Sequence, residues 1–291
     1  MPELPEVETI VRDLNKKVLG RAFIDVWTDS KKIVKKPQNF EEFKKEIKRR
    51  KIEKVKRRGK NILLELSGGK ALLVHQKLTG HLLLGNWEKE REVWKPQATG
   101  PLEDPMNRFL HLIFWLDDGK QLALSDLRKF AKVELWDSQK LVKSKELKSL
   151  GPEPLEKSFT FQKFQEVLKQ KKRKIKQILM DQTAIAGIGN IYSDEILFTA
   201  KIHPFKEVSK LNKLELKRIY QAIKKILKKA IELRGESISD FRDLEGKKGY
   251  FDKIRKAYRR EGEKCPRCGT QIKRIKLGGR SAHFCPKCQK L

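Results

Sequence analysis

The chain has 291 residues, and its 68 Lys and Arg against 38 Asp and Glu give a net charge of +30 at pH 7. Such an excess predicts a partner with dense negative charge, and nucleic acid is favoured because no apolar run approaches the ~20 residues that span a bilayer. The N-terminus lacks the basic and then apolar order of a secretory signal, so we expect a cytoplasmic protein, nucleoid-associated if it binds DNA.

The N-terminal stretch has two interpretations. Removal of Met1, which is usual before a small residue, would leave the secondary amine of Pro2 beside the carboxylate of Glu3. An α-amino group titrates near ~8, so part of it is a neutral nucleophile at neutral pH, and a neighbouring carboxylic acid can deliver a proton. Alternatively, Pro2 and Pro5 only open a helix that ends near Gly20.

The segments after this helix have the pattern of short strands. Turn signals at residues 67–69 and 117–119 separate neighbours, which is the hairpin spacing of an antiparallel sandwich or barrel. The polar run 88–107 contains three prolines and is expected to be a long loop, and 137–158 is expected to be a linker. The expected strands are 21–28, 51–56, 61–66, 71–78, 109–116, 121–124 and 132–136.

The second half has the periodicity of helices, with a break at 182–189 that is rich in Gly and small residues. Two helices joined by a glycine-containing turn, in so basic a chain, are typical of the helix-turn-helix class. The turn would present backbone N–H groups and the Asn190 side chain as an anion site, although an ordinary helix connection explains it equally. The expected helices are 161–170, 173–181, 190–201 and 210–233.

All 4 cysteines lie near the C-terminus, in two Cys-x-x-Cys pairs separated by 16 residues. This spacing favours one closed tetrahedral Zn²⁺ site over disulfides, which a cytoplasmic location disfavours, and a site without an open position is structural. Between the pairs, Arg280 beside glycines has the pattern of a hairpin tip that can approach a phosphate. The four cysteines are Cys265, Cys268, Cys285 and Cys288.

Motifs along the whole chain resemble those of the bacterial formamidopyrimidine-DNA glycosylases, which remove 8-oxoguanine and ring-opened purines from DNA. Each motif alone is short, and their common order and spacing make the resemblance specific. The matching stretches are PELPEVE at 2–8, RGK at 58–60, HQKLTG at 75–80, DLRKF at 126–130, LGPEPL at 150–155, GIGNIY at 187–192, IHP at 202–204, GYF at 249–251 and the two cysteine pairs.

The resemblance implies an α+β multidomain fold, with an N-terminal helix plus an antiparallel β-sandwich and a helical helix-two-turn-helix domain that carries a zinc-finger β-hairpin. The implied domains are a catalytic β-sandwich at 1–136, an interdomain linker at 137–158, a helical domain with a lesion-capping loop at 159–261 and a four-cysteine zinc finger at 262–291. One structural Zn²⁺ per chain, damaged double-stranded DNA as the partner, no membrane and a monomeric state are implied as well.

The resemblance also implies a mechanism. Pro2 would attack C1′ of a flipped-out nucleotide while Glu3 protonates the sugar ring oxygen, and the resulting iminium would allow β,δ-elimination of both flanking phosphates. Lys60 would contact a phosphate beside the lesion and support the chemistry, and Arg280 joins this catalytic set. Without the resemblance, Lys60 is simply one more surface lysine in a basic run.

Further residues are implied as DNA contacts. His75 and Asn190, together with Arg280, would hold the phosphates around the flipped nucleotide. Leu78, Arg128 and Phe130 would fill the gap left in the duplex. His75 and Phe130 also have interpretations as a core imidazole and a core aromatic.

The sequence departs from the motifs of this family at two positions, and the resemblance implies one further DNA contact. Leu78 replaces an expected Met, and Ala131 stands where Gly is usual. Leu is stiffer than Met but similar in volume, so the plug should survive. Tyr250 is implied as a DNA contact by its place in the GYF motif.

Two alternative functions stay open. An endonuclease VIII-like glycosylase would share the terminal Pro-Glu and the zinc finger but prefer oxidised pyrimidines. Leu4-Pro5, the Arg128–Phe130 wedge and the stretch 237–251, which resembles the loop that closes over an oxidised purine, favour the purine enzyme. We expect this loop to move. A non-catalytic zinc-ribbon nucleic-acid-binding protein would have the basic surface without the covalent chemistry.

Overall fold

The structure, a computed structural model of the whole chain, describes residues 1–169, 171–238 and 240–291. The last residue of the helix predicted at 161–170 and one residue of the loop predicted at 237–251 lie outside the described residues. The chain forms two compact units, the first made of residues 1–148 and 233–252 and the second of 149–232 and 253–291. The chain therefore leaves the first unit, returns to it and then completes the second.

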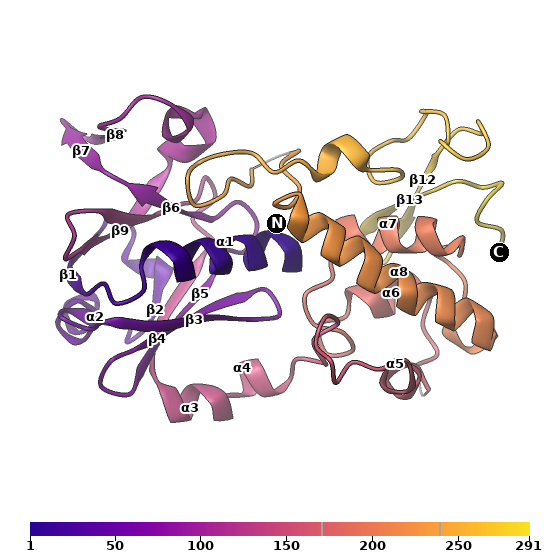
Figure 1. Cartoon of the computed structure of the whole chain (residues 1–291), viewed down its shortest axis with the longest axis horizontal. Coiled ribbons are helices and arrows are strands. Elements are labelled where there is room, and N and C mark those ends of the chain that lie inside the picture. The colour runs from indigo at the N-terminus through magenta and orange to yellow at the C-terminus, as the bar shows by residue number, and fades with distance from the viewer. Residues whose placement is uncertain (170, 239) are drawn as a thin grey trace. The chain divides into compact units, whose positions relative to one another are not determined.

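The first unit contains helix α1 (Leu4–Lys17) and a sandwich of two sheets (Figure 1). One sheet has the antiparallel order β1 (Phe23–Thr28), β9 (Leu110–Leu116), β10 (Gln121–Ser125), β6 (His81–Gly85). The other has the order β2 (Val34–Lys36), β11 (Lys132–Asp137), β5 (Lys70–His75), β4 (Asn61–Leu66), β3 (Ile52–Arg58), in which only the β2–β11 pairing is parallel. The predicted antiparallel β-sandwich is thus confirmed.

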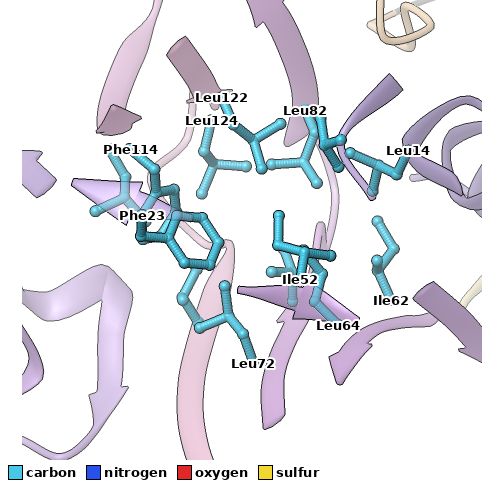
Figure 2. Close-up of a cluster of buried hydrophobic side chains, with 14 of the residues drawn as sticks. Leu14, Phe23, Ile52, Ile62, Leu64, Leu72, Leu82, Phe114, Leu122 and Leu124 are labelled. Carbon is cyan, nitrogen blue, oxygen red and sulfur yellow. The ribbon is translucent and has the colours of Figure 1, made fainter. Parts of the chain in front are cut away.

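The core of this unit lies between the two sheets. Ile62, Leu64 and Leu66 alternate along β4 and are buried, because successive side chains of a strand point to opposite faces. Leu14 joins them from α1, whose apolar residues recur at helical spacing and pack on β3 and β4. Figure 2 shows Leu14, Ile62 and Leu64 facing side chains of the other sheet, which are Phe114, Leu122 and Leu124.

The prediction of a long loop at 88–107 is wrong. Two short strands, β7 (Trp87–Glu90) and β8 (Val93–Pro96), form a hairpin, and the 3-10 helices η2 (Pro101–Glu103) and η3 (Pro105–Arg108) follow it. The ring centroids of Trp27 and Trp94 lie 5.1 Å apart. Only a few large residues anchor this segment, so its overall polarity concealed the strands.

The strand predicted at 71–78 is too long, since β5 ends at His75 and β6 begins at His81. Lys77 has a φ of 56° and the Gly80 amide donates to the Gln76 carbonyl, so the chain turns between the two strands. Leu78 therefore lies in a turn. The prediction also missed β2, β6, α2 (Phe40–Ile47) and η1 (Lys31–Ile33), and the stretch 137–158 contains α3 (Ser138–Lys143) and α4 (Lys145–Lys148).

The second unit is helical, as predicted, and ends in a β-hairpin. Gln182 fixes the turn between α6 and α7, because its amide donates to the Ile188 carbonyl at 2.7 Å and accepts from the Gly187 N–H at 2.9 Å. Its elements are α5 (Phe161–Leu168), α6 (Ile175–Met180), α7 (Asn190–Ala200), η4 (Val208–Lys210), α8 (Lys213–Glu232), β12 (Lys273–Leu277) and β13 (Arg280–Phe284), while η5 (Phe251–Ile254) spans the boundary with the first unit.

Within the residues that the structure describes, no helix combines the length and the apolar character needed to cross a membrane.

Candidate active site

The first turn of α1 places a carboxylate beside the chain's amino end. Glu3 is the N-cap, and its backbone N–H donates to the Glu6 carboxylate at 2.7 Å as part of a capping box. Pro5 lies in the first turn, where a helix needs no N–H donor. Pro2 is buried and Glu3 is 2% exposed, whereas Met1 is 40% exposed. Removal of Met1 would therefore uncover the Pro2 nitrogen next to Glu3.

The surroundings of the amino group, which is on Met1 in the structure, favour its neutral form. Burial is the largest influence and lowers its pKa, Glu3, Glu6 and Asp240 act in the opposite direction, and Lys60 lowers it further. The net result is a pKa below the usual value, which increases the fraction of neutral amine, the nucleophilic form. These influences also show that Lys60 and the carboxylates lie around the amino end.

Glu6 is a site residue that our sequence analysis missed. It is 1% exposed, and its second carboxylate oxygen accepts from the Glu236 amide at 2.8 Å. Gly235, at a φ of 83°, passes so close that a Cβ there would lie 2.7 Å from Glu6 Oε1. Glu6 lies three residues after the Glu3 N-cap, which is the capping-box spacing, and that signal was available in the sequence.

Lys60 follows Gly59 in the turn between β3 and β4, where Gly59 has a φ of 57°. Its side chain is only 7% exposed, so the interpretation as one more surface lysine is wrong. A buried ammonium needs charged or polar neighbours, and the amino end is among the groups it influences. The structure therefore brings Pro2, Glu3 and Lys60 together.

His75 ends β5 as a neutral hydrogen-bond donor. Burial, followed by the charges of Lys77, Lys60 and Lys132, lowers its pKa to about 3. Its Nδ1 accepts from the Lys77 amide at 3.0 Å, so the proton of the neutral ring lies on Nε2. That N–H is the group that can donate to an oxygen of a partner.

A buried carboxylate ties the turn after β5 to the turn after β10. Asp126 is fully buried, and it accepts from the Thr79 hydroxyl, from the Arg128 amide at 3.3 Å and from the Ala131 amide at 2.7 Å. The Thr79 hydroxyl also accepts from the Arg128 amide at 3.2 Å. Asp126 thus fixes the segments that carry Leu78, Arg128 and Phe130.

Phe130 is 51% exposed, so its interpretation as a core aromatic is wrong. The Arg128 guanidinium carbon lies 4.6 Å from the Phe130 ring centroid, which groups a cation and an aromatic ring on one exposed turn. Ala131 is buried and its methyl group would lie 3.2 Å from a Cβ at Gly80. The missing side chain at Gly80 therefore gives room for Ala131. Leu78 is partly buried beside this turn.

Tyr250 also belongs to the first unit. Its backbone amide donates to the Leu233 carbonyl at 2.8 Å, and its side chain is 47% exposed.

The remaining site residues, Asn190, Arg280 and the cysteines, belong to the second unit. Asn190 begins α7, and its Oδ1 is buried with no hydrogen-bond partner among the described residues. Arg280 is exposed at the start of β13, after Gly278 and Gly279, which have φ values of 54° and 73°. A helix N-terminus and an exposed guanidinium are both suited to phosphate oxygens.

The four cysteines fit one structural Zn²⁺. Their sulfurs all lie within 4.8 Å of one another, and Cys268 Sγ is 3.5 Å from Cys285 Sγ and 3.4 Å from Cys288 Sγ. Zn–S bonds of about 2.3 Å in a tetrahedron place sulfurs about 3.8 Å apart, close to this arrangement. Four thiolates leave no open coordination position, so the ion would hold the hairpin and take no part in catalysis.

Comparison with known proteins identifies the family. The formamidopyrimidine-DNA glycosylase N-terminal domain matches residues 1–133, the H2TH domain of the same enzymes matches 150–242, and the zinc finger found in FPG and IleRS matches 262–291. The formamidopyrimidine-DNA glycosylase of Pelotomaculum thermopropionicum is 41% identical over 291 residues, which is 100% of both chains. That of Carboxydothermus hydrogenoformans is 39% identical over 290 residues, again 100% of both chains.

The chain belongs to the formamidopyrimidine-DNA glycosylase family. Its activity is that of a DNA glycosylase and abasic-site lyase of base excision repair. The Lactococcus lactis Fpg protein in complex with DNA that contains an abasic site is 36% identical, with a TM-score of 0.86 over 99% of this chain and 100% of that one. Its complex with FAPY-dG-containing DNA has a TM-score of 0.85 with the same identity and coverage.

This member of the family also positions Arg280 through a buried network that the sequence analysis missed. Lys176 and Asp194 are 0% and 1% exposed and form an ion pair, and Lys176 Nζ donates to the Ser281 carbonyl at 2.8 Å. Asp194 also accepts from the backbone amide and the ring Nδ1 of His283 at 3.0 and 2.9 Å. The zinc hairpin is thereby held against α6 and α7, and no local pattern marks these residues.

Proposed function

We propose that this chain removes oxidised and ring-opened purines, namely 8-oxoguanine and formamidopyrimidines, from double-stranded DNA and then cleaves at the abasic site. The observation that carries the proposal is that Pro2 is buried beside the buried Glu3 and Lys60, in surroundings that lower the pKa of the amino group on Met1. A neutral amine next to a carboxyl group is the pair that imine formation at a sugar carbon requires. The Lactococcus lactis protein, bound to FAPY-dG DNA and to abasic DNA, supports the formamidopyrimidine and abasic-site parts of this proposal.

In the proposed reaction Met1 is absent and the Pro2 nitrogen attacks C1′ of the extruded nucleotide. The N–C1′ bond forms as the bond to the base breaks, and the base leaves with a proton. Glu3 protonates the sugar ring oxygen, which opens the ring and leaves an iminium on Pro2. Loss of a proton from C2′ then expels the 3′ phosphate, a second elimination expels the 5′ phosphate, and water releases Pro2.

The remaining residues would hold the DNA. His75 donates its Nε2–H to a phosphate, and Asn190 and Arg280 bind other phosphates. Lys60 contacts the phosphate beside the lesion. Leu78, Arg128 and Phe130 fill the gap in the duplex, and the exposed ring and guanidinium on one turn suit that role. Tyr250 and the loop 237–251 lie over the extruded base. The protein would work as a monomer on DNA in the cytoplasm.

Borohydride trapping tests this function. Protein with Pro2 as its first residue is mixed with duplex DNA that contains 8-oxoguanine opposite cytosine, and the reduced covalent adduct is measured. We expect Pro2→Gly to weaken the adduct, Glu3→Gln to suppress it, and a retained Met1 to abolish it.

Two matched substrates separate the alternatives. An adduct that forms only with an oxidised pyrimidine would assign the chain to endonuclease VIII-like activity. Absence of any adduct, with DNA binding unaffected by a blocked N-terminus, would leave a non-catalytic nucleic-acid-binding protein.

A further inference from the structure

A buried guanidinium joins two distant parts of the first unit. Arg242 is 4% exposed, and its Nη2 lies 3.0 Å from Asp104 Oδ1. Its Nη1 donates to the Phe241 carbonyl at 2.8 Å. A buried charge without its partner strongly destabilises the folded state, so separating the two segments would be costly and the ion pair holds them together. We call residues 101–108, which contain Asp104, the strut segment, and residues 241–246 the clamped loop.

A second buried side chain makes the same connection. Asn107 is 1% exposed, and its Nδ2 donates to the Pro101 carbonyl at 2.8 Å and to the Gly246 carbonyl at 3.3 Å. Its Oδ1 lies 3.0 Å from His81 Nε2. Gly246 has a φ of 81°, and a Cβ there would lie 2.6 Å from Asn107 Nδ2. The clamped loop therefore packs directly on the strut segment.

The clamped loop is also part of the core. Phe241 and Leu244 are 5% and 0% exposed within the main hydrophobic cluster. The Leu244 carbonyl accepts from the Leu84 amide of β6 at 2.8 Å. Residues 241–246 thus have a buried conformation with specific partners, and the motion expected for the longer loop stays a prediction.

The strut segment is itself held in place by packing and hydrogen bonds. Leu102 packs among the tryptophans on the outer face of the four-stranded sheet, and a Cβ at Gly85 would lie 2.5 Å from it. The Asp104 carboxylate caps η3 by accepting from the Met106 amide at 2.9 Å. The Met106 carbonyl accepts from the Ser125 hydroxyl at 3.0 Å.

The clamped loop is also linked to α1. Asp243 accepts from Arg234 Nε at 2.9 Å, and Arg234 Nη1 donates to Asp13 of α1 at 3.2 Å. The adjoining Glu236 amide donates to Glu6 at 2.8 Å. Contacts thus continue from the strut segment through the loop to the first helix.

We propose that the strut segment sets the conformation of the clamped loop before DNA binds, and that Asp104 and Arg242 are positioning residues for base excision. The inference rests on the proposed function, in which the loop 237–251 covers the extruded purine. A loop that is already ordered does not pay its ordering entropy on binding. An abasic site offers no base to cover, so cleavage there does not need the loop.

The test uses Asp104→Asn, Arg242→Gln and the double variant in the full chain. Asn keeps the cap of η3 and removes the charge. We expect amide hydrogen exchange in residues 241–248 to rise ~10-fold or more in each variant, and single-turnover excision of 8-oxoguanine to fall ~10-fold, while cleavage of a preformed abasic site changes less than ~2-fold. The double variant should lose no more excision activity than the single variant with the larger loss, because both substitutions remove the same ion pair. Lys95→Ala, which breaks an exposed pair with Glu90, is the control and should change nothing.

Unchanged exchange in both single variants would overturn the proposal. An equal loss of excision and abasic cleavage would also overturn it, since the effect would not depend on the base. Failure of the proposed function is recognised separately, because then the unaltered chain itself forms no borohydride adduct, and the exchange measurement still decides whether the strut segment holds the loop.

Discussion

The two units fix their functional side chains in different ways. In the first, a large core surrounds buried carboxylates, and Glu6 and Asp126 hold the amino end and the Phe130 turn through backbone amides. In the second, the hairpin that carries Arg280 is held by four thiolates and the buried Lys176–Asp194 pair. A segment too small to bury a core of its own needs metal–thiolate or ionic links, whereas the amino end and the Phe130 turn, on a large sandwich, are held by hydrogen bonds from backbone amides.

The largest effect should follow removal of the metal. Chelation, or Cys285→Ser, should unfold residues 262–291, because a structural Zn²⁺ in a small finger contributes on the order of 10 kcal/mol or more. Hydrogen exchange measured over both units should rise in the hairpin and stay unchanged in β4 and β5. An equal rise of hydrogen exchange in both units would show that the first unit also depends on the metal.

Breaking the buried ion pair should come next. Lys176→Met leaves the Asp194 carboxylate without its cation, which we expect to cost about 3–5 kcal/mol in the free energy of unfolding of the second unit. Urea denaturation followed by a probe in each unit measures it. The double variant Lys176→Met with Asp194→Asn should recover part of the loss, and no recovery would contradict the pairing.

Asp126→Ala tests the first unit's mode of support. It leaves the Ala131 amide and the Thr79 hydroxyl without their acceptor, and we expect about 2–4 kcal/mol of destabilisation from these buried groups. Thermal unfolding measures it. Asp137→Ala, which removes an exposed helix cap at α3, serves as the comparison and should cost only about 1 kcal/mol.

At neutral pH the smallest effect should be that of His75, because it appears only as the pH falls. Its pKa is about 3 in the folded chain against an ordinary value of 6.5, so the unfolded chain binds more protons between these values. This contribution to stability is complete above pH 6.5 and falls as the pH drops towards 3. Denaturant midpoints across that range should fall less steeply in His75→Gln, and parallel curves would contradict a neutral His75.

Features that depend on residues close together in the sequence could be predicted, whereas features that depend on residues far apart could not. The strand at 61–66 was predicted with the bounds that β4 has, because alternation is a local signal, and the cysteine spacing was equally local. The positioning roles of Asp126 and Lys176 were not predicted because each has a partner far away along the chain, Thr79 at 47 residues from Asp126 and Ser281 at 105 residues from Lys176. The β7–β8 hairpin escaped because Trp27 and Trp115, which hold it, belong to other strands.

The division of the chain also has a consequence for synthesis. Residues 233–252 complete the first unit, so an emerging polypeptide reaches residue 148 long before α1 can acquire its last neighbours. Until then the Glu6 carboxylate lacks the Glu236 amide, and Asp13 lacks Arg234. Folding as the chain leaves the ribosome cannot finish the catalytic end until most of the message is translated, and a fragment that stops at residue 148 should never acquire it.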